Sequence, residues 1–129
     1  MALSFDGSDQ HCPNAAAVLT AVPITMACWF NTNDRTNSQA MISLVDESKT
    51  NHYFILRIQA SSEDVTATAR DQVGATNHNA PTKPTNGQWH HGAAVFAGNT
   101  SRTAYMDGLT SGTDTGNRTP TGIDTTGVG

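Results

Sequence analysis

The chain has 129 residues and a formal net charge of −4, from 7 basic and 11 acidic side chains. This length suits one domain with one hydrophobic core. No basic stripe is present, so no nucleic-acid partner is expected, and no apolar run approaches the roughly 20 residues that span a membrane.

The composition indicates many short strands rather than a bundle of helices. Hydrophobic residues make up 36% and charged residues 14% of the chain, and Thr, Ser, Asn and Gly fill the difference. Polar turn formers at this density favour an antiparallel arrangement of short strands. The runs of Leu, Glu, Lys and Ala that packed helices use are missing.

The N-terminus reads MALSFDGSDQ and carries neither a charged leader nor a long apolar stretch. It therefore predicts no secretory signal. Three alternatives stay open. The protein stays in the cell that makes it, the sequence is a piece of a longer chain, or the protein leaves by another route, such as a virus particle released by lysis. The first predicted strand, Ala2–Phe5, ends at the turn signal DGSD.

Four more strands are predicted in the first half of the chain, where apolar runs are bounded by polar turns. They are Ile24–Phe30, Ala40–Val45, Tyr53–Ile58 and Asp64–Arg70. Tyr53, Ile55 and Arg57 alternate with Phe54, Leu56 and Ile58, which predicts a separate sheet face for each set. The segment DQVGATNHN, residues 71–79, is expected to be a loop.

The clearest hairpin lies in the second half of the chain. Its strands are Trp89–Ala97 and Ser101–Met106, joined by Gly98–Asn99–Thr100. The Thr- and Gly-rich tail offers only Ile123 and Val128 to anchor one more strand. About eight short strands with polar turns between them predict an all-β fold, an antiparallel β-sandwich or jelly roll.

Four motifs occur in order along this pattern. They are an opening strand and turn at Leu3–Asp9, the strand Ile24–Phe30, the sequence Gln-Trp-His-His at Gln88–His91, and a strand ending in Tyr-x-Asp-Gly at Tyr105–Gly108. Together they resemble the laminin-G-like, or concanavalin A-like lectin/glucanase, jelly roll, over residues 2 to about 112. The resemblance implies a single concanavalin A-like domain, residues 1–129, that recognises a glycan or a protein surface.

Two departures from the family pattern concern the sheet edge. Family domains run on through strands that return beside the first one, whereas this chain has at most one weak strand after Gly108. His11–Cys12 also stands where the family often has Tyr-Val. We therefore expect an open edge that is covered by another copy, by a missing C-terminal segment, or by a compact ending. The first of these alternatives predicts a homo-oligomer.

The adjacent histidines His90 and His91 raise the question of a metal site. Neighbouring residues of a strand point to opposite faces, so the two imidazoles cannot easily chelate one ion. A zinc site would need ligands from the other histidines, His11, His52 and His78. Strand packing is favoured for both residues.

The sequence predicts no enzyme. The glucanase relatives use two glutamates at Glu-x-Asp-x-x-Glu spacing, and this chain has only Glu47 and Glu63, each in a turn-like setting. A glycoside hydrolase is therefore the least favoured function.

Calcium is a possible cofactor, because family domains often hold Ca²⁺ through Asp, Asn and backbone oxygens. Candidate ligands are Asp6, Asp9, Asp46, Asp71 and Asp107. The favoured alternative is that these aspartates only form turns. Cys12 and Cys28 are either a disulfide or two small buried residues, and the second reading is favoured because no export signal is seen.

Sugar binding would require loop aromatics and polar groups. The aromatic residues of the strand-like runs are expected in the core: Trp29, Phe30, Phe54, Trp89 and Phe96. The candidate ligand-binding residues are Asn33, Asp34, Arg35, Asn51, Tyr53, Asn77 and His78. Their favoured alternative is a set of solvated turn residues. We expect a non-catalytic binding module. The alternative is a structural or surface-decoration domain of a virus particle or other oligomer.

Overall fold

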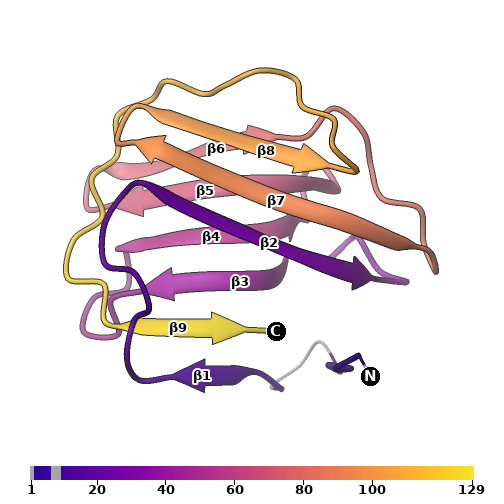
Figure 1. Ribbon diagram of the computed structural model, residues 1–129, viewed down its shortest axis with the longest axis horizontal. Coiled ribbons are helices and arrows are strands. Elements are labelled where there is room, and N and C mark those ends of the chain that lie inside the picture. The colour runs from indigo at the N-terminus through magenta and orange to yellow at the C-terminus, as the bar shows by residue number, and fades with distance from the viewer. Residues whose placement is uncertain (1, 7–9) are drawn as a thin grey trace.

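The computed structural model describes residues 2–6 and 10–129 and shows two antiparallel sheets packed face to face (Figure 1). The large sheet has the strand order β1-β9-β3-β4-β5-β6, and the small sheet has the order β2-β7-β8. The strands are β1 (Cys12–Asn14), β2 (Ile24–Asn31), β3 (Gln39–Val45), β4 (Tyr53–Gln59), β5 (Asp64–Asp71), β6 (Gly74–Asn79), β7 (Trp89–Gly98), β8 (Ser101–Met106) and β9 (Thr125–Val128). The described residues contain no helix that is long and apolar enough to cross a membrane.

The period-2 alternation of the strands builds the core between the sheets. In β4, Phe54, Leu56 and Ile58 are at most 2% exposed, while the residues between them are half-buried. The ring of Phe54 contacts Phe96 of the small sheet edge-on, with ring centroids 5.1 Å apart. In β4 the sequence pattern therefore assigns the two faces, inward for the apolar set and outward for the other.

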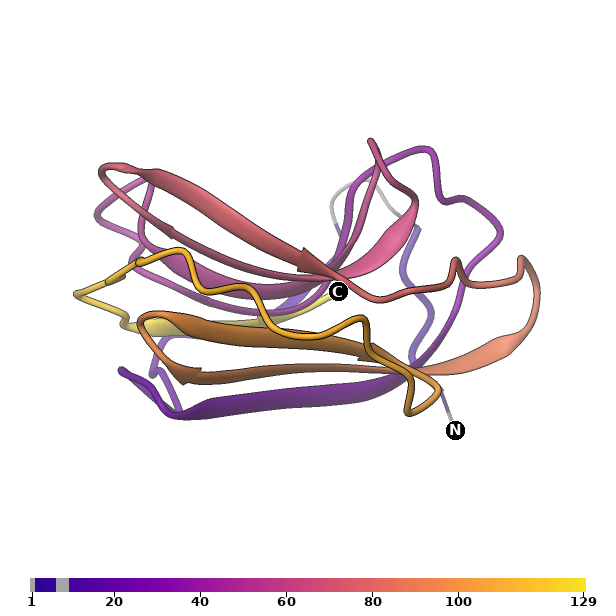
Figure 2. The ribbon, with the colours of Figure 1, turned by 90° about the horizontal axis from the view of Figure 1, so that it is seen from above.

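The large sheet is curved. The ends of its strands bend away from the small sheet, so its outer face is concave (Figure 2). A register shift between Ala40 and Ile42 in β3 marks an irregularity in the β3–β4 ladder, and such bulges bend and twist a sheet. The concave face belongs mainly to β3, β4, β5 and β6.

Arg102 fixes the segment that leads from β8 back to the large sheet. It is 1% exposed and pairs with Asp114, while its guanidinium also donates to the carbonyl oxygens of Asn99 (3.0 Å) and Gly116 (2.6 Å). The backbone groups of Arg102 and Asp114 also bond to each other in both directions. Residues 109–118 therefore run along β8 and close that edge of the small sheet.

Most sequence predictions of strands are confirmed. The predicted runs correspond to β2, β3, β4, β5, β7 and β8, and the tail anchors a strand that ends at Val128, β9. Ala2–Phe5 is not a strand, and Gly7–Asp9 lies outside the described residues. The loop prediction for residues 71–79 was wrong, because Gly74–Asn79 forms β6. An edge strand with one wet face needs few apolar residues, so its polar sequence resembled a loop.

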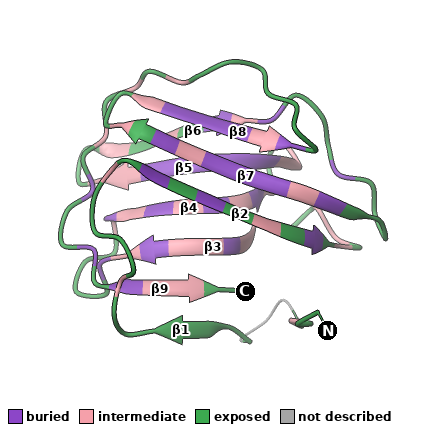
Figure 3. Ribbon diagram, viewed as in Figure 1, coloured by how far each residue is buried: buried purple, intermediate pink, exposed green. Residues whose placement is uncertain are grey.

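The expectation that both tryptophans lie in the core was also wrong. Trp29 is 67% exposed and Trp89 is 56% exposed, whereas Phe30, Phe54 and Phe96 are buried as predicted. Each tryptophan occupies an outward position of its strand, and buried and exposed segments alternate along β2 in Figure 3. Cys12 and Cys28 are free thiols, on β1 and β2 respectively. The expected burial of both was wrong for Cys12, which is exposed, and burial raises the pKa of the half-buried Cys28.

Candidate functional site

The concave face of the large sheet is the candidate site. Alternation in β4, β5 and β6 directs a polar set of side chains to this face, and the register of the three strands aligns them in rows. The set consists of Tyr53, Arg57, Gln59, Asp64, Thr66, Thr68, Arg70, Asn77 and Asn79. Ile55 lies in the middle of this face, opposite Thr68.

Two threonines fix the orientation of the asparagines on β6. The Thr68 hydroxyl donates to Oδ1 of Asn77 at 2.8 Å, and the Thr66 hydroxyl lies 3.1 Å from Oδ1 of Asn79. Both threonines are fully buried beneath the longer side chains around them. The Asn77 amide nitrogen has no hydrogen-bond partner among the described residues, so a positioned donor faces the solvent.

Of the seven residues predicted to bind a ligand, the structure places two on this face. Tyr53 lies on β4 and Asn77 on β6, with β5 between them. The other five lie elsewhere: Asn33, Asp34 and Arg35 in the β2–β3 connection, Asn51 in the β3–β4 connection, and His78 in the interior. The seven residues therefore form no single cluster, and ligand contact at each of them stays a prediction.

The β2–β3 connection is held by its own hydrogen bonds. Arg35 donates to the carbonyl oxygen of Pro84 at 2.5 Å and lies 3.6 Å from the Glu63 carboxylate. Hydrogen bonds from the side chains of Thr36 and Asn37 lower the pKa of Asp34 to about 2. These contacts tie the connection to the loop before β7 and to the β4–β5 turn.

His78 links the two sheets. It lies on β6, and its Nδ1 accepts a hydrogen bond of 2.9 Å from the backbone N–H of Ala104 on β8. Its Nε2 lies 3.3 Å from the Ser111 hydroxyl. Burial lowers the pKa of His78. The residue therefore acts as a neutral interior acceptor in the fold.

The adjacent histidines diverge, as predicted. His90 points inward, with Nδ1 2.7 Å from Oδ2 of Asp107 and Nε2 accepting the backbone N–H of Thr85 at 2.9 Å. His91 points outward and contacts the ring of Trp29 edge-on. Both ring nitrogens of His90 thus already have partners, and the histidine joins β7 to the loop before it. Hydrogen bonds from the His91 backbone and the His90 ring lower the pKa of Asp107.

The two glutamates and the aspartates named as calcium candidates are spread over the molecule. Glu47 precedes β4 and Glu63 follows it, so the two carboxylates lie beyond opposite ends of one strand. Asp46, Asp71 and Asp107 each accept hydrogen bonds from their own turns or from the segments packed on them. No three His, Cys, Asp or Glu side chains converge as metal ligands in residues 2–6 and 10–129. Asp9 lies outside this part, and a calcium site stays a prediction.

The outer face of the small sheet has a different character. Its outward positions include Trp29, Trp89, His91 and Tyr105, and the register places Trp29 directly opposite His91. Beside it, a groove of about 1520 Å³ separates the edge strand β2 from the N-terminal residues and the end of β9. In the described part of the chain, β2 pairs only with β7, so its other edge is open.

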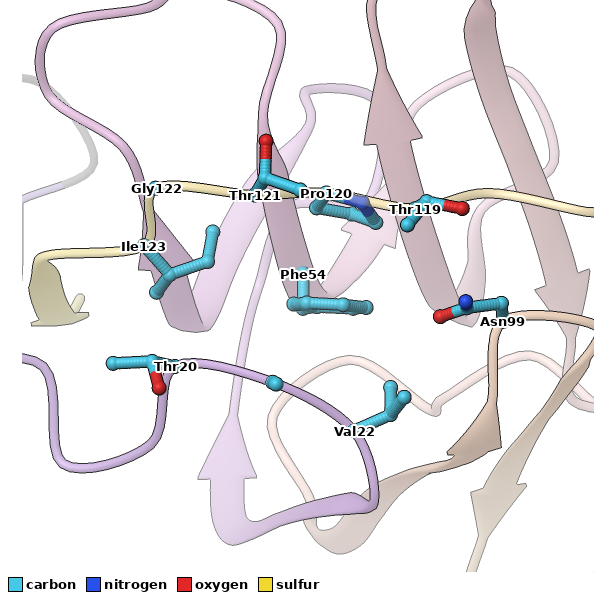
Figure 4. Close-up of a pocket in the computed structure, with 10 residues that line it drawn as sticks. Thr20, Val22, Phe54, Asn99, Thr119, Pro120, Thr121, Gly122 and Ile123 are labelled. Carbon is cyan, nitrogen blue, oxygen red and sulfur yellow. The ribbon is translucent and has the colours of Figure 1, made fainter.

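A smaller pocket of about 470 Å³ lies at one end of the sandwich (Figure 4). Phe54 forms its centre, between Val22 and Pro120, and the carboxamide of Asn99 points toward the ring. The hydroxyls of Thr20, Thr119 and Thr121 point away from the ring. The pocket therefore offers few hydrogen bonds to a sugar, and the concave face offers many more.

Sequence reasoning missed Arg57, Arg70 and the exposed tryptophans as surface candidates. A signal for the arginines was present, since Arg57 alternates in phase with Tyr53 and Arg70 ends the strand with one wet face. For the tryptophans there was no such signal, because the exposure of a strand residue depends on which face of its sheet packs against the other sheet.

Known proteins share this fold. Mouse laminin alpha1 chain domains LG4-5 match with a TM-score of 0.71 and 16% identity, over 92% of this chain and 31% of that one. Domain 4 of AbnA, a GH43 extracellular arabinanase from Geobacillus stearothermophilus solved in complex with arabinotriose, matches with a TM-score of 0.71 and 17% identity. That match covers 87% of this chain and 53% of that chain. The chain thus spans about a third and about half of these two structures.

No curated protein sequence matches the chain. The family model of Laminin_G_3, described as the concanavalin A-like lectin/glucanases superfamily, matches residues 6–128. This match covers nearly the whole sequence and agrees with the two-sheet architecture. The chain therefore belongs to the laminin G-like branch of the concanavalin A-like lectin/glucanase superfamily.

Proposed function

We propose that this domain is a non-catalytic module that binds a glycan on the concave face of its large sheet. One observation carries the proposal: the face presents oriented, partly free polar side chains, of which the Asn77 amide is fixed by Thr68. Sugar hydroxyls need such donors and acceptors, and Ile55 and Tyr53 add apolar surface for the C–H groups of a sugar ring.

Two further findings support this proposal. The two glutamates flank β4 instead of facing one another, so they form no acid and nucleophile pair. The domain of the arabinanase that shares this fold was solved with arabinotriose, which makes an oligosaccharide a natural first ligand to test.

A titration followed by amide NMR would test the proposal. Arabinotriose and a panel of neutral and acidic oligosaccharides would be added to the labelled protein. We expect shifts along β4, β5 and β6, and an Asn77→Ala variant that binds several-fold more weakly. Asn31→Ala is the matched control, because Asn31 is an exposed strand asparagine on the small sheet. Shifts confined to Trp29 and Trp89, or no shift with any glycan, would overturn the proposal.

A second candidate function is assembly with another copy through the open edge of β2. It is favoured by the uninterrupted β2 ladder, which contains no charge, no proline and no bulge to block pairing with a further strand. Trp29 would add to the contact between the two copies, since burying the ring of a tryptophan that is 67% exposed stabilises an interface. Neither an oligomer nor a virion location has support from the comparisons, and both stay predictions.

Light scattering tests this second function directly. A dimer that Trp29→Lys dissociates and Val73→Lys leaves intact would support it. Val73 is the matched control because it is 84% exposed on the β5–β6 turn, away from β2. A monomer at every concentration would contradict assembly.

A further inference from the structure

The cations of this chain divide into two groups. Of the seven Lys and Arg side chains, all of which lie in the described ranges, five reach a carboxylate: Arg35, Lys49, Lys83, Arg102 and Arg118. Arg57 and Arg70 form no ion pair and no side-chain hydrogen bond with the described residues. In a chain with an excess of acids, two cations without acidic partners are unexpected.

Both unpaired arginines lie on the concave face. Arg57 is on β4 opposite Thr66, and Arg70 is on β5 opposite Tyr53. In each residue the Nε atom is buried and has no hydrogen-bond partner among the described residues. Because Nε is buried, a ligand oxygen would instead pair with the outer nitrogens of each guanidinium. What distinguishes these two arginines from the other five cations is the absence of an ion pair with a described carboxylate.

The spacing of the two arginines suits an extended ligand. Arg57 and Tyr53 are four residues apart on β4, about 13 Å at the usual rise of a strand, and Arg70 lies one strand further across. In the register, Ile55 and Thr68 lie between the positions of the two arginines, with Asn77 on the next strand opposite Thr68. A chain of several sugar units bridges such a span, whereas a single sugar reaches one arginine only.

No described carboxylate on this face neutralises the charges of Arg57 and Arg70. Asp64 is the one carboxylate on the outward positions of the described β3, β4, β5 and β6, and it accepts a hydrogen bond from Asn79 at 3.3 Å, on the β6 side. The net charge of −4 disfavours general attraction of polyanions. Binding of an anion therefore requires this local pair.

We propose that Arg57 and Arg70 select an acidic oligosaccharide, with one carboxylate or sulfate group at each guanidinium and the intervening sugars over Ile55 and Thr68. The inference rests on the proposed glycan-binding function and adds the class of glycan. An acidic peptide is disfavoured, because the face offers hydroxyls and amides and lacks a deep apolar pocket for side chains.

Binding to three immobilised polymers tests the inference: polygalacturonate for carboxylates, dextran sulfate for sulfates, and neutral dextran. Arg57→Gln and Arg70→Gln are each compared with Lys83→Gln, which removes the same charge from an exposed loop lysine. We expect binding to one acidic polymer, roughly tenfold weaker for each arginine variant and changed less than about twofold by Lys83→Gln. Added salt should weaken it.

The outcomes separate the two proposals. Preference for polygalacturonate or for dextran sulfate supports the inference and identifies the anionic group. Equal losses in Lys83→Gln and the arginine variants would show nonspecific charge attraction and overturn it. If neutral glycans bind the concave face and arginine variants bind them unchanged, the inference fails while the proposed function holds. If no neutral or acidic glycan binds, both fail.

Discussion

The two outer faces of the sandwich arise from the same alternation but carry opposite chemistry. The outward strand positions of the small sheet hold no Asp, Glu, Lys or Arg and expose two tryptophans, Trp29 and Trp89. The concave face of the large sheet holds hydroxyls, amides and the two unpaired arginines. Alternation decides only which side chains point outward. The two outer faces differ because the outward side chains of the large sheet form hydrogen bonds, whereas those of the small sheet are uncharged and partly aromatic.

The two faces differ in the kind of group that lacks a partner among the described residues. On the concave face these groups include the Nε donors of Arg57 and Arg70, and on the small sheet they are backbone groups along the open edge of β2. Unpaired side-chain donors favour small polar ligands with acceptor atoms, and unpaired backbone groups favour pairing with another strand. Variants that change one face and leave the other intact therefore separate the two functions.

The largest expected effect contrasts a paired arginine with an unpaired one. Arg102→Met leaves Asp114 without its ionic partner and removes the side-chain hydrogen bonds to the carbonyl oxygens of Asn99 and Gly116, so we expect a loss of about 3–5 kcal/mol in the free energy of unfolding. Arg57→Met should cost less than about 1 kcal/mol. Urea denaturation measures both. Equal losses would mean that Arg57 serves folding and is not reserved for a ligand.

A smaller effect is expected from pH at the contact between the two sheets. The folded pKa of His78 lies below its ordinary value of 6.5, so the unfolded state binds more protons as the pH falls through 6.5. Stability is therefore fully present above this pH and declines below it. His78→Gln should remove this part of the pH dependence, as measured by urea denaturation between pH 8 and pH 5. An unchanged pH profile would contradict the role of His78 as a neutral acceptor.

The smallest effect is expected on the aromatic face. Trp29→Thr replaces the ring by a β-branched residue that also favours strands and removes the ring contact with His91, so we expect a loss of less than about 1 kcal/mol in the free energy of unfolding. Phe54→Ala, which empties a core position, should cost about 3–5 kcal/mol. Thermal unfolding compares the two. A similar loss for both would mean that Trp29 is packed and that the small sheet presents no free aromatic surface.

Much of the fold followed from local patterns. The alternation in Tyr53–Ile58 predicted which side chains of β4 enter the core, and the divergence of His90 and His91 followed from the same period of two. β6 could not be recognised in this way, because its polar residues form an edge strand that buries little. For the candidate site, Tyr53 and Asn77 were named, but nothing in the sequence could show that they share a face with Arg57 and Arg70.

The sequence by itself determined most of the strands and the inward and outward sets of β4, because these depend on residue type and spacing along the chain. Only the tertiary structure decided which outward residues meet. Strand order and register bring β4, β5 and β6 together, pair four cations with carboxylates at least twelve residues away, and leave Arg57 and Arg70 without ionic partners among the described residues. Such pairings join residues far apart in sequence, so they depend on how the two sheets close.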